Sequence, residues 1–282
     1  MKEKNLLLRT ITCVVGVPLV LSMIFLVPQY NYIVFSLFVI VMGFIGSLEM
    51  SRILFSKTVP LAYIAPIIPI VQYLQGVLGL YAQLPDLAFV LILLGAFARE
   101  IKTGEPDDFK SSIDRASRHG LLVIYPSYLI SFVLKFLAIS GITSQAIMMY
   151  LLLVFGNDMS AYIFGRLFGK NNKGVFKVSP KKSVAGYVGS LFAAVGISFA
   201  CCAIFKSSLP AFTALQKIIL GVGISLTANI GDLLESVFKR SAGVKDSGNI
   251  IPGRGGALDC LDSPLASAPI FFIIFNMVME AM

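Results

Sequence analysis

The residues of this chain whose types and spacing could support chemistry gather in two polar segments. The longer segment begins at Gly231 and reads GDLLESVFKRSAGVKDSGNIIPGRGGALDCLDS. Asp259 and Asp262 lie three residues apart near its end, so one helical turn would bring their carboxylates together. Paired carboxylates beside cations suit a hard divalent cation, because Mg²⁺ takes oxygen ligands and leaves other positions to water and substrate. The segment therefore predicts a metal site that holds phosphates.

The same segment offers cations and glycines to an anionic substrate. Its start predicts a helix on which Asp232, Glu235 and Lys239 share one face, because their spacing follows the helical period. The glycines near its end let backbone N–H groups approach an anion closely. We predict metal ligation by Asp232, Asp246, Asp259 and Asp262. We predict catalytic roles for Asp246, Lys239, Arg240 and Lys245. The alternative is a solvated loop with ordinary ion pairs.

The shorter segment begins at Gly156 and reads GNDMSAYIFGRLFGKNNKGVFKVSPKKS. Asp158 lies inside an apolar run, where an ionisable residue is costly and is by default a functional candidate. A hydrogen bond that packs two helices together is the alternative for this residue. The cations that follow suit a polyphosphate, because Arg binds two phosphate oxygens at once and Lys adds point charge. The substrate-binding residues that we predict across both segments are Asp158, Arg166, Lys182, Ser236, Gly255 and Gly256.

The elements that must position these groups are membrane helices. Of the 282 residues, 57% are hydrophobic and 13% are charged, whereas an average soluble domain has about 25% charged residues. The chain is therefore predicted to be all-α, a polytopic integral membrane protein with a polar cavity that faces the cytoplasm. We predict nine spans: Thr10–Val27, Tyr32–Ser47, Val59–Tyr81, Leu84–Ala98, Gly120–Ile139, Ala146–Phe164, Val184–Phe205, Phe212–Ile230 and Pro264–Met279. The third and fourth also fit re-entrant segments.

The basic residues predict the orientation of these spans. With nine spans, all but three of the 23 Lys and Arg residues fall on the side of the N-terminus; the three are Lys135, Lys206 and Lys217. Cytoplasmic loops carry such an excess, so the N-terminus and both polar segments are predicted to be cytoplasmic, in the cell membrane. The net charge of +8 fits this bias and attraction to anionic lipid. Membrane lipid, and not nucleic acid, is the expected partner.

The longer segment resembles the C-terminal signature of the phosphatidate cytidylyltransferases, or CDP-diacylglycerol synthases. Their pattern runs S-x-x-K-R, then K-D, then P-G-H-G-G, then D-R-x-D. The stretches NDMSAYIFGRLFGK and SPKKS resemble the block that precedes it, and LEMSR at residues 48–52 resembles a further family feature. The resemblance implies transfer of CMP from CTP to phosphatidate, giving CDP-diacylglycerol and pyrophosphate for phospholipid biosynthesis. It also implies a Mg²⁺ cofactor, with room for a second cation.

The resemblance also implies a domain organisation, and three positions depart from the family pattern. No internal repeat and no low-complexity linker divides the sequence, so we expect one membrane-embedded domain over residues 1–282; the resemblance implies less family-like spans in 1–118 and the catalytic part in 146–282. Arg254 stands where the family has His, and Cys260 stands where it has Arg. Ala185 replaces a glutamate that the family commonly has beside the glycine after SPKK. The effect of these changes on activity is open.

Two other functions fit parts of the pattern. A related CTP-dependent enzyme could act on an isoprenoid lipid, because apolar spans do not reveal the lipid tail. A transporter could also place ionisable groups along a substrate path, but it would concentrate them near the bilayer midplane, whereas here they lie in predicted loops. The oligomeric state is open as well, a homodimer included.

Overall fold

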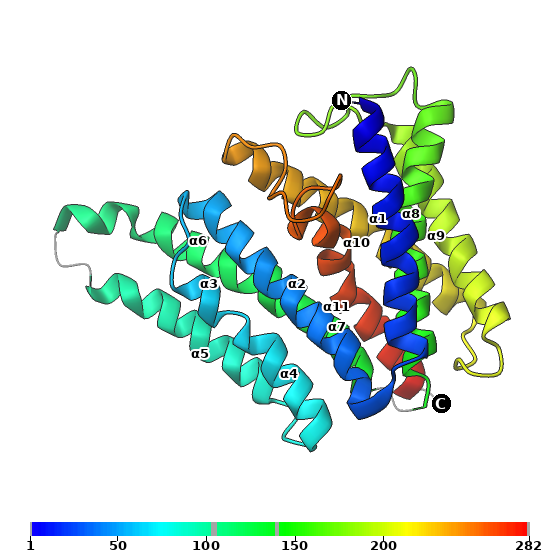
Figure 1. The fold of residues 1–282 in the computed structure, drawn as a ribbon, viewed down its shortest axis with the longest axis horizontal. Helices are drawn as coiled ribbons and strands as arrows, with labels where there is room; N and C mark the ends of the chain where they lie inside the picture. Colours follow the sequence, from blue (N-terminus) through cyan, green and yellow to red (C-terminus); the bar gives the residue numbers. More distant parts are fainter. Residues whose placement is uncertain (1, 103–105, 139–140, 281–282) are drawn as a thin grey trace. The chain divides into compact units, whose positions relative to one another are not determined.

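The structure, a computed structural model, is built from helices. It describes residues 2–102, 106–138 and 141–280, and in these ranges the only β-type pairings are isolated bridges (Figure 1). Six helical segments there are long and apolar enough to cross a membrane: Gln29–Phe55, Leu61–Leu78, Thr143–Phe168, Val184–Ile204, Ala214–Ser241 and Leu258–Glu280. The predicted class, an all-α polytopic membrane protein, is confirmed. The predicted number of nine spans is not established, because three of the nine predicted runs are outside these six segments.

The described chain divides into two compact units, and the division is not a simple N-terminal and C-terminal one. Unit 1 holds residues 1–137 together with 241–260, and unit 2 holds residues 138–240 together with 261–282. The glycine-rich part of the longer polar segment therefore belongs with the N-terminal helices. The single domain predicted for residues 1–282 stays a prediction.

Unit 1 is a bundle of helices around α2 (Gln29–Phe55). Its remaining helices are α1 (Lys2–Phe25), α3 (Leu61–Ile64), α4 (Ile67–Leu78), α5 (Leu84–Ala98), η1 (Arg99–Lys102), η2 (Pro106–Ser111), α6 (Ser112–Val123), η3 (Ile124–Tyr128), α7 (Leu129–Lys135) and η4 (Phe136–Ala138). Small residues let α2 pack closely against its neighbours, since Gly43 and Gly46 are buried beside side chains of η3 and α7. Helix α2 also buries one acidic side chain, that of Glu49.

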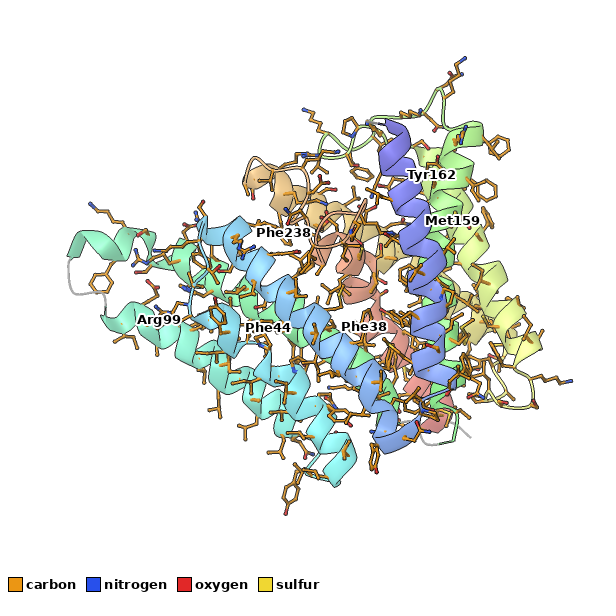
Figure 2. The ribbon with its side chains drawn as sticks, viewed as in Figure 1. Phe38, Phe44, Arg99, Met159, Tyr162 and Phe238 are labelled. Carbon is orange, nitrogen blue, oxygen red and sulfur yellow. The ribbon has the colours of Figure 1, made fainter. Side chains whose placement is uncertain are left out.

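Unit 2 contains α8 (Thr143–Phe168), α9 (Val184–Ile204), α10 (Ala214–Ser241) and most of α11 (Leu258–Glu280). Its interior is built around Tyr150, which is 1% exposed and donates a hydrogen bond of 2.6 Å to the carbonyl oxygen of Pro264. A membrane leaves no water for buried polar groups, so such internal partners are required. The outward faces carry large apolar side chains such as Met159 (Figure 2) and Phe192, which are 60% and 72% exposed. Lipid can cover these faces.

The helix boundaries agree with the apolar runs in some places and exceed them in others. Helix α5 has the predicted bounds, and α9 ends one residue before its predicted end. Helix α10 continues through Ser241, eleven residues beyond the predicted end of its span, with a Glu235–Lys239 ion pair one turn apart. An apolar run marks what lipid can cover, whereas a helix continues as long as its polar residues find such partners. The charged start of the longer segment therefore lies on α10, as predicted.

A close approach between α9 and α10 generates a prediction on stability. A Cβ atom added at Gly221 would lie 2.5 Å from the Cα atom of Val195, in the backbone of the facing helix. We expect Gly221→Ala to lower the midpoint of thermal unfolding in detergent, because overpacking costs about 1–3 kcal/mol. Gly196→Ala on α9 is the matched control, since a Cβ atom there meets nothing within 4 Å. Equal midpoints for the two variants would contradict the close packing.

Candidate functional site

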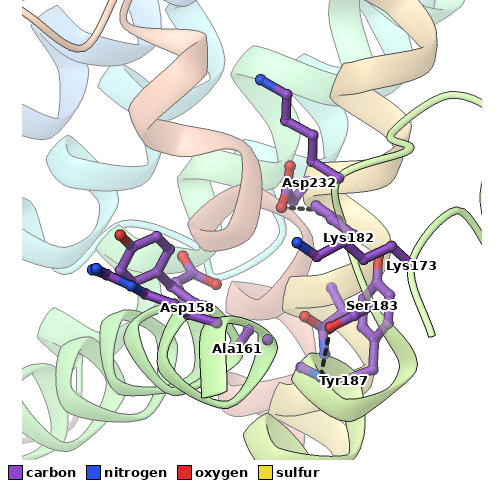
Figure 3. Close-up of a pocket in the computed structure, with 13 residues that line it drawn as sticks. Asp158, Ala161, Lys173, Lys182, Ser183, Tyr187 and Asp232 are labelled. Atoms are coloured by element: carbon purple, nitrogen blue, oxygen red, sulfur yellow. Dashed lines mark hydrogen bonds and ion pairs between the residues drawn. The ribbon is translucent and has the colours of Figure 1, made fainter. Parts of the chain in front are cut away.

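Unit 2 contains a pocket of about 500 Å³ at the polar ends of α8, α9 and α10 (Figure 3). Its walls combine Lys and Arg side chains with two carboxylates. The lining residues are Asp158, Ala161, Tyr162, Gly165, Arg166, Lys173, Lys181, Lys182, Ser183, Gly186, Tyr187, Asn229 and Asp232. Three of the predicted substrate-binding residues, Asp158, Arg166 and Lys182, are thus brought to one pocket, together with the predicted metal ligand Asp232.

The loop between α8 and α9 supplies most of the pocket's cations. It is braced by backbone hydrogen bonds, in which Gly174 N donates to Lys182 O over 3.2 Å and Lys182 N donates to Ser179 O over 3.1 Å. Ser183 caps α9, because its Oγ accepts a hydrogen bond of 3.2 Å from Gly186 N. An N-cap serine satisfies an amide that the helix leaves free. The cap therefore ends the loop at a fixed point, one residue after Lys182.

An ion pair joins the two polar segments. Lys182 Nζ contacts Asp232 Oδ2, and the two side chains are 25% and 36% exposed (Figure 3). The same ammonium lies 5.9 Å from the centre of the Tyr187 ring. Such partial burial strengthens the attraction relative to a pair in water. The residues of this pair are 50 positions apart in sequence, and their meeting brings α10 to the loop before α9.

Further carboxylates lie beside this pair in unit 2. Asp158 Oδ1 accepts a hydrogen bond of 3.2 Å from Ser263 Oγ, and Asp262 Oδ1 accepts one of 2.7 Å from Ser263 N. Asp262 also interacts electrostatically with Asp232, Glu235 and Asp158. Glu235 is 1% exposed and pairs with Lys239 over 2.5 Å. Acidic groups gathered in this way repel one another, so a bound cation would stabilise them.

The carboxylates of unit 2 fit a cation that shares its ligands with a substrate. Within the described ranges, no three His, Cys, Asp or Glu side chains are arranged to hold a metal ion by themselves. Mg²⁺ is usually bound by only one or two carboxylates, with water and substrate phosphates as its other ligands. Asp158 and Asp232 offer oxygen donors of that kind beside the Lys and Arg side chains of the pocket, and Asp262 interacts with both. The donor set therefore fits Mg²⁺ in the presence of a phosphate ligand.

Other predicted residues lie in the loop of unit 1 that precedes α11. Asp246 and Asp259 both lie against Gly255, where an added Cβ atom would be 3.3 Å from Asp246 Cβ and 3.1 Å from Asp259 Cγ. Asp259 Oδ2 accepts hydrogen bonds from Ser247 N and Gly256 N, over 2.8 and 2.7 Å. One oxygen of Asp259 thus joins the backbone at Ser247 to the backbone at Gly256. Metal ligation by Asp246 and Asp259 stays a prediction, as does a catalytic role for the exposed Lys245.

The remaining predicted residues lie on α10 and in the glycine turn. Ser236 and Arg240 are on α10 but not among the residues that line the pocket. Gly255 has a φ of +115°, a backbone conformation that favours glycine. Their roles stay predictions.

Sequence reasoning missed Asn229 as a pocket residue. It lies one turn before Asp232 on α10, and its Nδ2 donates to Ser190 Oγ over 3.2 Å. Its Oδ1 accepts a hydrogen bond of 3.4 Å from Asn157 Nδ2 on α8. Asn229 thus links three helices beside the pocket. The sequence contains a signal for this role, since Asn229 is a polar amide inside the apolar run predicted as the eighth span. Such groups face protein partners and not lipid.

The chain matches a known protein family over most of its length. The model of a family described as the cytidylyltransferase family matches residues 7–278. A phosphatidate cytidylyltransferase of Haemophilus influenzae is 41% identical over 129 residues, which are 45% of this chain and 44% of that protein. One of Rickettsia bellii is 37% identical over 149 residues, 50% of this chain and 62% of that protein. One of Staphylococcus aureus is 38% identical over 125 residues, 44% and 46%. The chain spans about half the length of the curated relatives it matches.

Proposed function

The chain belongs to the cytidylyltransferase family, and on this basis we propose that it transfers CMP from CTP to phosphatidate. The products are CDP-diacylglycerol, a precursor in phospholipid biosynthesis, and pyrophosphate. The observation that carries the proposal is the pocket of unit 2, in which Arg166, Lys173, Lys181 and Lys182 line the same space as Asp158 and Asp232. Cations suit the phosphates of CTP and phosphatidate, and carboxylates suit the metal ion that such phosphates carry.

The reaction is an in-line displacement at the α-phosphorus of CTP. An oxygen of the phosphatidate phosphate forms a new bond to this phosphorus, while the bond from the α-phosphorus to the oxygen that bridges it to the β-phosphate breaks. Pyrophosphate leaves with the electron pair of that bond. A phosphate monoester loses its second proton near pH 6, so at neutral pH the nucleophile needs no protein base. Catalysis then depends mostly on positioning and on neutralisation of charge.

The cations in and near the pocket can bind phosphates, and the carboxylates can bind the metal ion. Arg166 can bind two phosphate oxygens at once, and Lys173, Lys181 and Lys182 add point charge around the triphosphate. Asp232, which lines the pocket, and Asp262, which lies beside it, would hold Mg²⁺ together with water and the phosphates, and Asp158 could hold a second cation; bound Mg²⁺ would neutralise charge on the phosphates. The pairing with Asp232 holds the ammonium of Lys182 inside the pocket before a substrate arrives. This organisation lowers the cost of ordering the side chain during the reaction.

The proposed reaction is tested by measuring pyrophosphate release from labelled CTP in the presence of Mg²⁺. We expect release by the purified protein to depend on phosphatidate, and Asp262→Asn to lower turnover by at least about a hundredfold, the scale of losing a main electrostatic stabiliser. Asp114→Asn is the control, because Asp114 pairs with Arg118 on α6 in unit 1. Release with an isoprenoid phosphate but not with phosphatidate would transfer the assignment to that lipid class. Release without any lipid would contradict both.

We propose that the protein resides in the cell membrane and that its pocket opens to the cytoplasm. The loop between α8 and α9 is rich in Lys, as cytoplasmic loops are. We expect an epitope tag inserted after Lys177 to be hidden from antibody in sealed right-side-out membrane vesicles, and a tag inserted after Ser207 to be accessible. Permeabilised vesicles are the control, in which both tags should react. A tag after Lys177 that reacts in sealed vesicles would overturn the orientation.

A further inference from the structure

A single buried carboxylate connects α2 with the glycine-rich loop of unit 1. Glu49 is 3% exposed on an apolar helix. Its Oε1 accepts a hydrogen bond of 3.0 Å from Ala257 N, and its Oε2 accepts one of 3.0 Å from Leu258 N and one of 2.9 Å from Ser247 Oγ. Three donors, all about 200 residues further along the chain, thus meet one side chain. A buried charge is costly unless it is held in this way.

The contacts of Glu49 satisfy the start of α11. The first amides of a helix have no partners within it, and they carry a partial positive charge that favours a carboxylate. Ala257 and Leu258 lie at this start, and both are buried from water. Ala257 N and Leu258 N donate to different oxygens of Glu49, so the side chain must present an acceptor at both positions, as a carboxylate does. The requirement is therefore for a carboxylate, and not merely for a polar residue.

Ser247 extends the contact to a second carboxylate. Its Oγ lies 2.9 Å from Glu49 Oε2 and 3.0 Å from Asp259 Oδ2, and its backbone N also bonds Asp259. Glu49, Ser247 and Asp259 thus form one network, which holds the loop at both of its ends. The residue between Lys245 and Ser247 is Asp246, so any shift of Ser247 moves the two residues that we predict for catalysis.

The glycines of the loop are shaped around the same carboxylate. A Cβ atom added at Gly248 would overlap Glu49 Oε1, and one added at Gly256 would overlap both Glu49 Oε2 and Ser247 Oγ. The loop backbone can approach the carboxyl group only because these positions lack side chains. Two positions of the glycine-rich stretch therefore depend on Glu49, which belongs to the LEMSR stretch of α2.

We propose that Glu49 is a positioning residue for the loop of residues 244–259. It touches no substrate; it acts through Ser247 and the start of α11 to hold Asp246 and Asp259, the two metal ligands predicted in this loop, in a fixed arrangement. This inference rests on the proposed function. Partners that orient metal ligands affect metal affinity about 10- to 100-fold when they are changed. Glu49 should therefore control how much Mg²⁺ the enzyme needs, and not only how stable it is.

The test compares Glu49→Gln with the unchanged full-length protein in detergent. In either orientation the glutamine NH₂ group faces the N–H of Ala257 or of Leu258, which breaks that contact while it preserves the shape of the side chain. We expect the Mg²⁺ concentration for half-maximal turnover to rise about tenfold. Hydrogen–deuterium exchange should increase in residues 246–258 but not in residues 265–278 of α11. Glu100→Gln is the charge-matched control, because Glu100 pairs with Arg115 in the same unit, and it should change neither quantity.

Each outcome decides the proposal. Lower turnover at an unchanged Mg²⁺ requirement would mean that Glu49 is only structural, and unchanged values throughout would mean that it has no role; both overturn the inference. If the unchanged protein does not transfer CMP, the proposed function fails, and hydrogen exchange together with Mg²⁺-induced thermal stabilisation still tests the loop. If Glu49→Gln does not fold, Ser247→Ala serves instead, since it removes one donor and leaves the carboxylate. It should raise the Mg²⁺ requirement by a smaller factor, and no rise would overturn the inference.

Discussion

The cost of burying a carboxylate among membrane helices governs both units of this protein. Lipid offers no water to a charged group, so each carboxylate must find an ammonium group, an amide or a hydroxyl group inside the protein. In unit 2 this requirement joins Glu235, which is 1% exposed, to Lys239. In unit 1 it attaches a distant loop to Glu49. The hydrogen bonds and ion pairs that offset the cost of burying these carboxylates therefore also hold the polar segments in place. The proposed chemistry depends on the positions that result.

Small residues make these interactions geometrically possible. Gly221 lets α10 approach the backbone of α9, and Gly256 lets the loop approach the carboxyl group of Glu49. Helices and loops that approach so closely leave little freedom to the side chains between them. Phosphoryl-type transfer needs such rigidity, because most of its catalysis comes from groups that are in place before the reaction. Packing in this protein is thus part of the proposed catalytic mechanism.

The sequence predicted the features that depend on local pattern. The helical class, the bounds of α5 and the position of Asp232, Glu235 and Lys239 on one helix follow from apolar runs and the helical period. Helix α10 continues beyond the eighth predicted span and α11 begins six residues before the ninth, because hydropathy does not detect a helix that continues on polar contacts. The partners of Glu49 could not be predicted, since they lie about 200 residues away. The local sign of such a partner was a lone glutamate two residues after the apolar run Tyr32–Ser47.

In the proposed mechanism Asp232 holds the Lys182 ammonium in the pocket, so the two residues act as one unit on the nucleotide. The most direct measurement is kcat/KM for CTP in a cycle of four proteins: the unchanged chain, Lys182→Gln, Asp232→Asn and the double variant. We expect each single change to lower kcat/KM at least about tenfold, the scale of a charged hydrogen bond. The double variant should lose little more than the worse single one, because partners in one ion pair are not additive. Losses in the double variant that equal the product of the single losses would contradict the claim.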